Sequence, residues 1–153
     1  MKYGIPTLII CVSIMGCDYR SNQTEILELK KKNAELQEKL DGISMQEKCA
    51  KMAEHSFETM PKDRNAIYDY YCHYSKNRNK FYMIITMIYP KTGSTSKILI
   101  DLLESKTIAS YMWQADKVKK YWEVKPFYVD INGEKKDWTT EEWDAFEKGS
   151  MSD

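Results

Sequence analysis

The chain has 153 residues, and its 23 Lys and Arg side chains balance 23 Asp and Glu, so its formal net charge at pH 7 is zero. This balance provides no basic surplus for nucleic-acid phosphates and no polybasic patch for anionic lipid. The length allows one modest domain and a further helical segment. The sequence contains no G-x-S-x-G, H-E-x-x-H, P-loop or dinucleotide-binding glycine motif. We therefore expect a non-enzymatic protein without cofactor, metal or nucleic-acid partner.

Residues 1–16 have the organisation of a signal peptide. Lys2 supplies the positive charge, an apolar stretch follows, and Gly16 is the small residue that a signal peptidase requires. The apolar run covers about 11 residues, whereas a membrane-spanning helix needs roughly 20. We expect this segment to be cleaved off.

The segment Ile14-Met15-Gly16-Cys17 resembles the lipobox of bacterial lipoproteins. This resemblance implies cleavage before Cys17 and acylation of its side chain, which would hold the protein in a membrane facing the periplasm. Each buried CH₂ of an acyl chain contributes roughly 0.8 kcal/mol, so two or three chains hold a protein firmly. Asp18 resembles the inner-membrane retention signal of enterobacterial lipoproteins. The inner membrane is therefore favoured, and the outer membrane stays open as the alternative.

Residues 17–24 are polar and unpatterned, which predicts a short tether, and residues 25–43 predict a coiled-coil-like helix. Apolar residues and one Asn recur at alternating steps of three and four, at Ile26, Leu29, Asn33, Leu36, Leu40 and Ile43. Asn33 suggests control of register, because a buried Asn is best satisfied by a second Asn across a parallel dimer. Two interpretations stay open: a homodimer through 25–43, and a single helix that packs on a partner or on its own domain.

Residues 44–149 predict an α+β domain, with an antiparallel sheet of four to six strands and helices packed on one face. The capping box Ser44-Met45-Gln46-Glu47 predicts a fresh helix that ends at Pro61. Strands are expected over 68–74, 81–89, 98–103, 108–115, 121–124 and 127–131. Asn132-Gly133 is typical of a type I′ hairpin turn, and Thr139-Thr140-Glu141-Glu142 opens a short helix with Trp143 and Phe146 inward. Residues 150–153 are expected to be a disordered tail.

Two cysteines, Cys49 and Cys72, remain after signal removal and acylation. In an oxidising compartment an even pair predicts a disulfide, here tying the helix to the first strand. Its closed loop would stabilise the fold by roughly 3 kcal/mol. The alternatives are a metal site from both cysteines with His55 and His73, and an envelope thiol enzyme or hydrolase that uses Cys72 and His73.

The chain is rich in aromatic residues, with 11 Tyr, 4 Trp and 4 Phe. A sheet with one wet face buries only alternate residues, so some rings should be exposed. Exposed Tyr and Trp suit binding to a protein or glycan. The candidate binding surface comprises Tyr70, Tyr74, Trp113, Trp122 and Tyr128. The alternative is a sheet that helices cover on both faces.

Three features together are similar to small exported bacterial domains of unknown function. They are the helix that carries Cys49, the turn His73-Tyr74-Ser75-Lys76, and the run 121–126 before Asn132-Gly133. This resemblance brings no activity with it. The preferred hypothesis is an envelope lipoprotein that presents a non-enzymatic binding domain on a helical stalk to an unidentified envelope protein or glycan. A phage- or plasmid-encoded exclusion or lysis lipoprotein would use the same parts.

Overall fold

The structure is a computed structural model that describes residues 15–116 and 118–152, with side chains from residue 23 onward. The chain forms two compact units, Met1–Asp41 and Gly42–Asp153. Most of the expected signal peptide lies outside the described residues. So do Ile14 of the lipobox and the side chain of Cys17.

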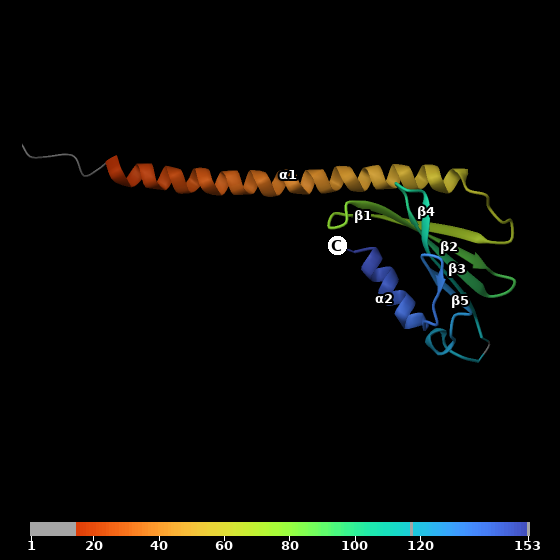
Figure 1. Cartoon of the computed structure of the whole chain (residues 1–153). Coiled ribbons are helices and arrows are strands. Elements are labelled where there is room, and N and C mark those ends of the chain that lie inside the picture. Colours follow the sequence, from red (N-terminus) through yellow and green to blue (C-terminus); the bar gives the residue numbers. More distant parts are fainter. Residues whose placement is uncertain (1–14, 117, 153) are drawn as a thin grey trace, which may run out of the picture. The chain divides into compact units, whose positions relative to one another are not determined.

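The first element is a single helix, α1 (Met15–Thr59), of 45 residues (Figure 1). Two predictions are therefore wrong: residues 17–24 are helical rather than a tether, and no new helix begins at Ser44. A glycine inside a helix costs only about 1 kcal/mol, so Gly42 does not interrupt it. Ser44 is a surface position of the continuous helix. None of the described helices has the length and apolar character needed to cross a bilayer.

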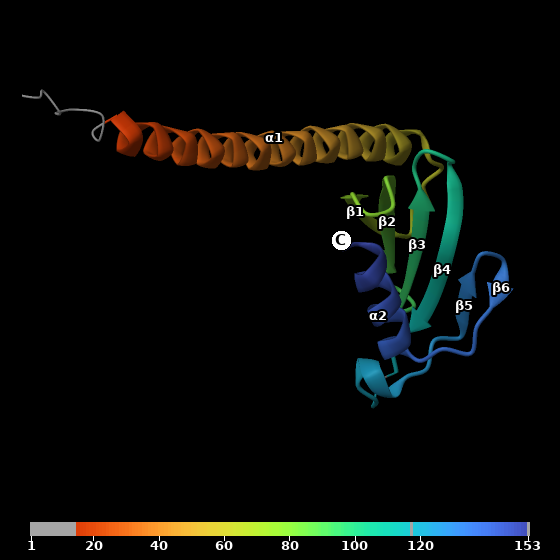
Figure 2. The ribbon, with the colours of Figure 1, turned by 60° about the vertical axis from the view of Figure 1, so that its left-hand side comes forward.

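The second unit contains one six-stranded antiparallel sheet, which agrees with the predicted α+β class. Its strands are β1 (Ile67–Ser75), β2 (Lys80–Tyr89), β3 (Ser94–Asp101), β4 (Lys106–Gln114), β5 (Tyr128–Ile131) and β6 (Glu134–Lys135). The strands lie side by side in chain order, as Figure 2 shows. Each strand therefore pairs with the one that precedes it through a local turn.

The turn at Asn132-Gly133 is as predicted. Both residues have positive φ, 54° and 85°, which a type I′ turn requires, and they join β5 to β6. The strand predicted over 121–124 is wrong. Residues Tyr121–Glu123 form one turn of 3-10 helix, η1, in which the Glu123 carboxylate accepts a hydrogen bond from the Lys120 amide.

The sheet is covered on both faces, so the predicted placement of all helices on one face is wrong. In the register of β1 and β2, Cys72 lies opposite Met83, and Tyr71 lies opposite Ile84. Consecutive strand residues point to opposite faces. Cys49 and Ala53 of α1 pack on the first face, in what we call the α1-side core, with Cys72, Phe81, Met83, Ile85 and Leu102. Trp143 of α2 packs on the second face, in what we call the α2-side core, with Tyr82, Ile84, Leu99, Ala109, Tyr111 and Val129.

The C-terminal helix α2 (Thr140–Ser150) begins at the predicted capping box. The Thr139 hydroxyl accepts a hydrogen bond from the Glu142 amide, and the Glu142 carboxylate accepts one from the Thr139 amide. The predicted tail begins too early, because Ser150 is buried and Met151 packs against the α2-side core.

A side chain of α1 shields part of the free edge of β1. The Gln46 amide donates to the Cys72 carbonyl and accepts from the Tyr74 amide, both at 3.0 Å. These are the two bonds that a neighbouring strand would make. The edge is thus blocked at these positions, as exposed sheet edges in natural proteins commonly are.

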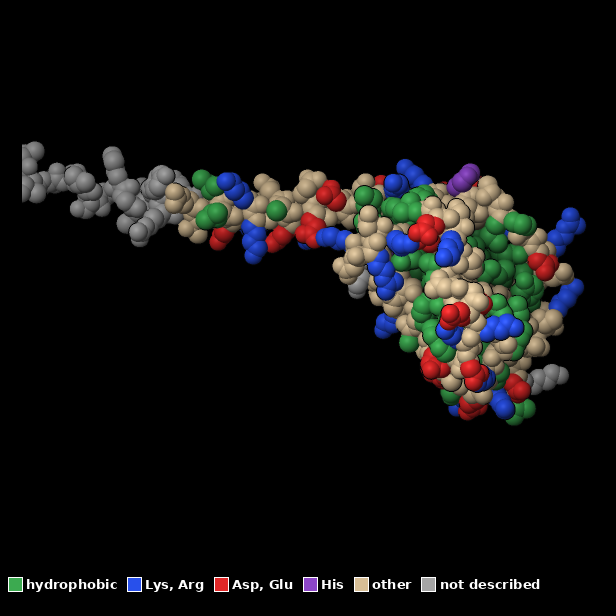
Figure 3. Space-filling model, viewed as in Figure 1, with side chains coloured by type: hydrophobic (Ala, Val, Ile, Leu, Met, Phe, Trp, Pro, Cys, Tyr) green, Lys and Arg blue, Asp and Glu red, His purple; other side chains and the backbone are tan. Residues whose placement is uncertain are grey.

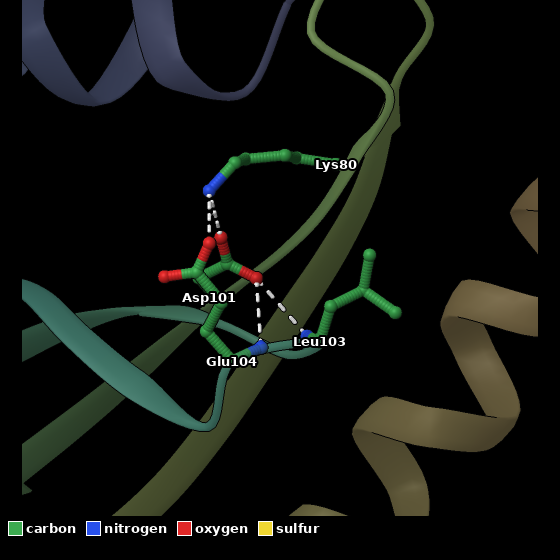
Figure 4. Close-up of polar contacts among 4 residues, drawn as sticks. All are labelled: Lys80, Asp101, Leu103 and Glu104. Carbon is green, nitrogen blue, oxygen red and sulfur yellow. Dashed lines mark hydrogen bonds and ion pairs between the residues drawn. The ribbon is translucent and has the colours of Figure 1, made fainter.

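The turn between β3 and β4 is held by Asp101, which is 1% exposed (Figure 4). Its Oδ1 accepts hydrogen bonds from the amides of Leu103 and Glu104, at 3.0 and 3.2 Å. Its Oδ2 pairs with Lys80 Nζ at 2.6 Å, and the same ammonium reaches Glu104 at 2.8 Å. One buried carboxylate therefore fixes the turn and ties it to the start of β2.

Candidate functional site

Two residues of the predicted aromatic surface, Tyr70 and Tyr74, are packed inside the domain. Both are partly buried against the α1-side core. The Tyr70 ring lies 4.5 Å from that of Phe57, and the Tyr74 ring lies 5.0 Å from that of Phe81, measured between centroids. These rings contribute to the attachment of α1 to the sheet.

The other three predicted aromatics lie in different places. Trp113 is partly buried against the α2-side core, with its ring 4.9 Å from that of Tyr121. Tyr128 pairs with Met112 in β4, next to the pair formed by Val129 and Tyr111. Because neighbouring strand residues point to opposite faces, Tyr128 lies on the face opposite to Val129. Trp122 is 59% exposed, with Lys120 Nζ 5.3 Å from its ring. The structure does not bring the five together on one surface.

The cysteines Cys49 and Cys72 do come together, as two buried free thiols in the α1-side core. The Cys49 thiol donates to the Tyr82 carbonyl at 3.8 Å, and Gln46 Nε2 lies 3.9 Å from Cys72 Sγ. Burial, together with contact with the Cys72 thiol, raises the pKa of Cys49 to about 12. The proximity suits the expected disulfide, which stays a prediction.

The pair Cys72 and His73 is not assembled as a nucleophile and its base. Adjacent residues of a strand point to opposite faces, so the Cys72 thiol faces the α1-side core and the His73 ring lies on the other side of β1. Among the described residues, no group of three or more His, Cys, Asp or Glu side chains is arranged to hold a metal ion.

The second unit has a groove between β1, β2 and α2, with a volume of about 570 Å³. Ile84 and Thr86 from β2 lie at its base, and Asp69, Tyr70 and Tyr71 from β1 line one side. The other side is lined by the last turns of α2 and the residues after it, Asp144, Glu147, Lys148, Met151 and Ser152. We call this the β1–α2 groove.

The β1–α2 groove exists because α2 is short. Its 11 residues cover the α2-side core around Tyr111 and Trp143, whose rings stack at 4.9 Å. The same face of β1 stays open, so Tyr71 is 58% exposed. Ile67 and Ile88 are paired in register and are also exposed. They extend the apolar surface along the first two strands.

The α2 side of the groove is acidic and held in place. Glu147 Oε2 accepts Lys97 Nζ at 2.7 Å and the indole N–H of Trp143 at 2.9 Å, so its charge is matched and its position fixed. Asp144 accepts a longer bond, 3.4 Å, from the Tyr121 hydroxyl. Desolvation raises the pKa of Asp144, and the nearby Glu147 carboxylate adds to this, against the opposing charge of Lys97.

The charges facing the groove combine to a small negative excess. Asp69 on the β1 side and Asp144 on the α2 side each carry a negative charge, and Lys148 carries a positive one. Tyr71 and Met151 add apolar surface between them. The arrangement suits a ligand with aliphatic or aromatic groups and a positive charge.

Sequence reasoning missed Tyr71, although β1 carries the signal that identifies it. Tyr70 and Tyr74 have the same parity as Cys72, the residue expected to face α1. Tyr71 has the opposite parity, so it had to point away from that helix.

In comparisons with protein families, curated proteins and solved structures, no match to this chain was found.

Proposed function

We propose that this protein is a bacterial envelope lipoprotein, anchored through Cys17, that binds a polypeptide in the β1–α2 groove without catalysing a reaction. The observation that carries this proposal is Tyr71, a large ring 58% exposed on the side of a groove with an apolar base. Exposed aromatic side chains beside apolar surface commonly mark binding sites.

The chemistry of the groove favours a segment with an apolar side chain and a Lys or Arg. The apolar group would pack on Tyr71 and over Ile84, and the cation would lie near Asp69 and Asp144. A Cys49 thiol with a pKa of about 12 is protonated at neutral pH. The Cys72 thiol and the His73 ring lie on opposite faces of β1. These points support a binding role over a thiol enzyme.

The test is site-directed photocrosslinking in the intact envelope. A benzophenone amino acid replaces Tyr71 in the full-length protein, and the matched control places it at Phe127, which is 62% exposed but does not line the groove. We expect a discrete crosslinked polypeptide from position 71 and none from position 127. Adding Asp144→Lys should abolish the product by reversing the charge that a cationic segment needs.

Two results would count against the binding proposal. One is the absence of a crosslink from position 71 in a protein that is correctly localised. The other is a product that survives Asp144→Lys or forms equally from position 127, since either would place the contact outside the groove. A crosslink to glycan alone would reject the polypeptide as ligand.

The membrane anchor is tested separately. Cys17→Ser should remove labelling by a radioactive fatty acid and leave an uncleaved or soluble form, because the lipobox assigns acylation to the Cys17 thiol. Asp18→Ser should shift the protein from the inner to the outer membrane. Labelling that persists in Cys17→Ser would refute the lipobox, and unchanged fractionation of Asp18→Ser would remove this residue from the localisation argument.

A further inference from the structure

A stripe of apolar side chains lies exposed along α1 within the first unit and just beyond it. Its apolar residues are each between 50% and 59% exposed, and they are Ile26, Leu29, Leu36, Leu40 and Ile43. With Asn33 they form a row that we call the α1 seam. Figure 3 shows apolar side chains standing among charged ones on this helix. A row of this kind on a well-formed helix calls for a partner surface.

The seam has the period of a coiled coil. Its six residues follow at steps of three, four, three, four and three, so Ile26, Asn33 and Leu40 take the a positions. Leu29, Leu36 and Ile43 take the d positions. Because α1 runs unbroken through Gly42, the whole seam lies on one continuous helix.

We propose that the α1 seam pairs with the seam of a second copy of this chain, in a parallel and in-register two-stranded coiled coil. A single a-position Asn is the feature that specifies such a pair. In a parallel dimer Asn33 faces Asn33 of the second copy, and each amide finds a partner. In an antiparallel dimer a positions meet d positions, so Asn33 would be buried against Leu36.

The flanking charges fit the same arrangement. In a parallel dimer a g residue lies next to the e residue five positions further along the other helix. Glu25 then meets Lys30 twice, once on each side of the seam, and Lys32 meets the uncharged Gln37. In the antiparallel alternative g positions face g positions, and Lys32 would lie against Lys32. The same antiparallel alignment would also place Glu25 against Lys39, so the charge pairs are compatible with the parallel pair of identical chains and Asn33 decides between the two orientations.

Dimerisation is tested on the full-length protein in detergent by sedimentation equilibrium. Leu36→Ala removes a d-position side chain and is expected to weaken dimerisation roughly tenfold or more. The matched control is Leu27→Ala, the same change at a residue that is 66% exposed but outside the seam. It should leave the dimer unchanged. Circular dichroism verifies that both variants keep their helix.

Orientation is tested by charge exchange and by thiol trapping. Glu25→Lys and Lys30→Glu should each weaken the dimer, and the double variant should restore it. Leu29→Cys should form an intermolecular disulfide on oxidation, because d positions of parallel helices face each other, whereas Leu27→Cys should not.

Three outcomes would overturn this inference. A monomeric wild-type protein would reject the second copy as the partner. Equal effects of Leu36→Ala and Leu27→Ala would reject the seam. Failure of the charge exchange to restore the dimer, or no trapping at Leu29→Cys, would reject the parallel register. None of these depends on a ligand in the β1–α2 groove.

Discussion

Asp101→Asn isolates the contribution of one buried ion pair to the stability of the domain. The substitution keeps an oxygen where Oδ1 accepts the amides of Leu103 and Glu104. It replaces Oδ2 with an NH₂ group, which faces Lys80 Nζ across a contact of 2.6 Å. Two donors then oppose each other, and a buried charge is lost while the turn keeps its hydrogen bonds.

The expected cost is about 2 kcal/mol. A hydrogen bond to a charged group contributes roughly 1.5–3 kcal/mol, and breaking a fully buried ion pair costs roughly 3–5 kcal/mol. The Lys80 side chain is 37% exposed and keeps Glu104 as a partner, which places the cost in the lower range. For a domain of this size, about 2 kcal/mol corresponds to a decrease of roughly 8 °C in Tm.

The assay is urea unfolding, followed by tryptophan fluorescence, to which the buried Trp143 contributes. The control is Glu104→Gln, which removes the exposed partner of Lys80 and should change the free energy of unfolding by less than about 1 kcal/mol. Equal stabilities of Asp101→Asn and Glu104→Gln would refute the reasoning, because both pairs would then contribute as surface pairs do.

The same variant has a defined pH dependence. Burial alone would raise the pKa of Asp101, but Lys80 and the two amide hydrogen bonds outweigh it and leave the pKa below its usual value. A lowered folded-state pKa stabilises the fold above the unfolded-state pKa of about 4, and this stabilisation is lost as the pH falls through the folded-state value. The stability difference between wild type and Asp101→Asn should be constant near neutral pH and shrink in acid. A difference that stays constant into strong acid would contradict this account.

Three further predictions concern other described features. Gln46→Ala should lower the free energy of unfolding by about 1–3 kcal/mol, because it leaves the edge of β1 unpaired at two backbone groups. Gln37→Ala removes an exposed bond to Asp41 and should have little effect on urea unfolding. Protein isolated from the envelope should resist alkylation at Cys49 and Cys72 after denaturation until a reductant is added, and two reactive thiols without reductant would reject the disulfide. Crosslinking from position 71 should weaken on acidification at a pH above the usual range of an aspartate, since the pKa of Asp144 is raised; weakening only within that usual range would contradict this.

The parts of the fold that follow from local chemistry were predictable. Asn132-Gly133 fixed a turn because few other residue pairs adopt two successive positive φ values, and Thr139 with Glu142 fixed a helix start. The box at Ser44 failed because a Ser and a Glu three residues apart cap a helix only where the preceding backbone leaves the helical conformation. Nothing near Gly42 enforces such a departure.

The placement of the helices on the two faces needed information beyond the period of the strands. Alternation says which residues share a face, but not which face another element covers. One indication was present: Phe81 to Ile85 are five consecutive large side chains, and all five are buried. A continuous apolar run is typical of a strand covered on both faces. The choice of Tyr70 instead of Tyr71 as a surface ring was avoidable, because Tyr70 shares the parity of Cys72, the residue expected to face α1.

The order of the strands has a consequence for how the domain forms. Because sheet order equals chain order, every strand can pair as soon as the strand before it is available, and no early segment waits for a distant one. The second half of α1 precedes β1, so the core around Cys49 can begin to form with the first hairpin and is completed by Leu102 after β3. The core around Trp143 closes only when the last helix arrives. Short sequence separations between partners favour rapid assembly and limit the time during which bare strand edges are open to other chains.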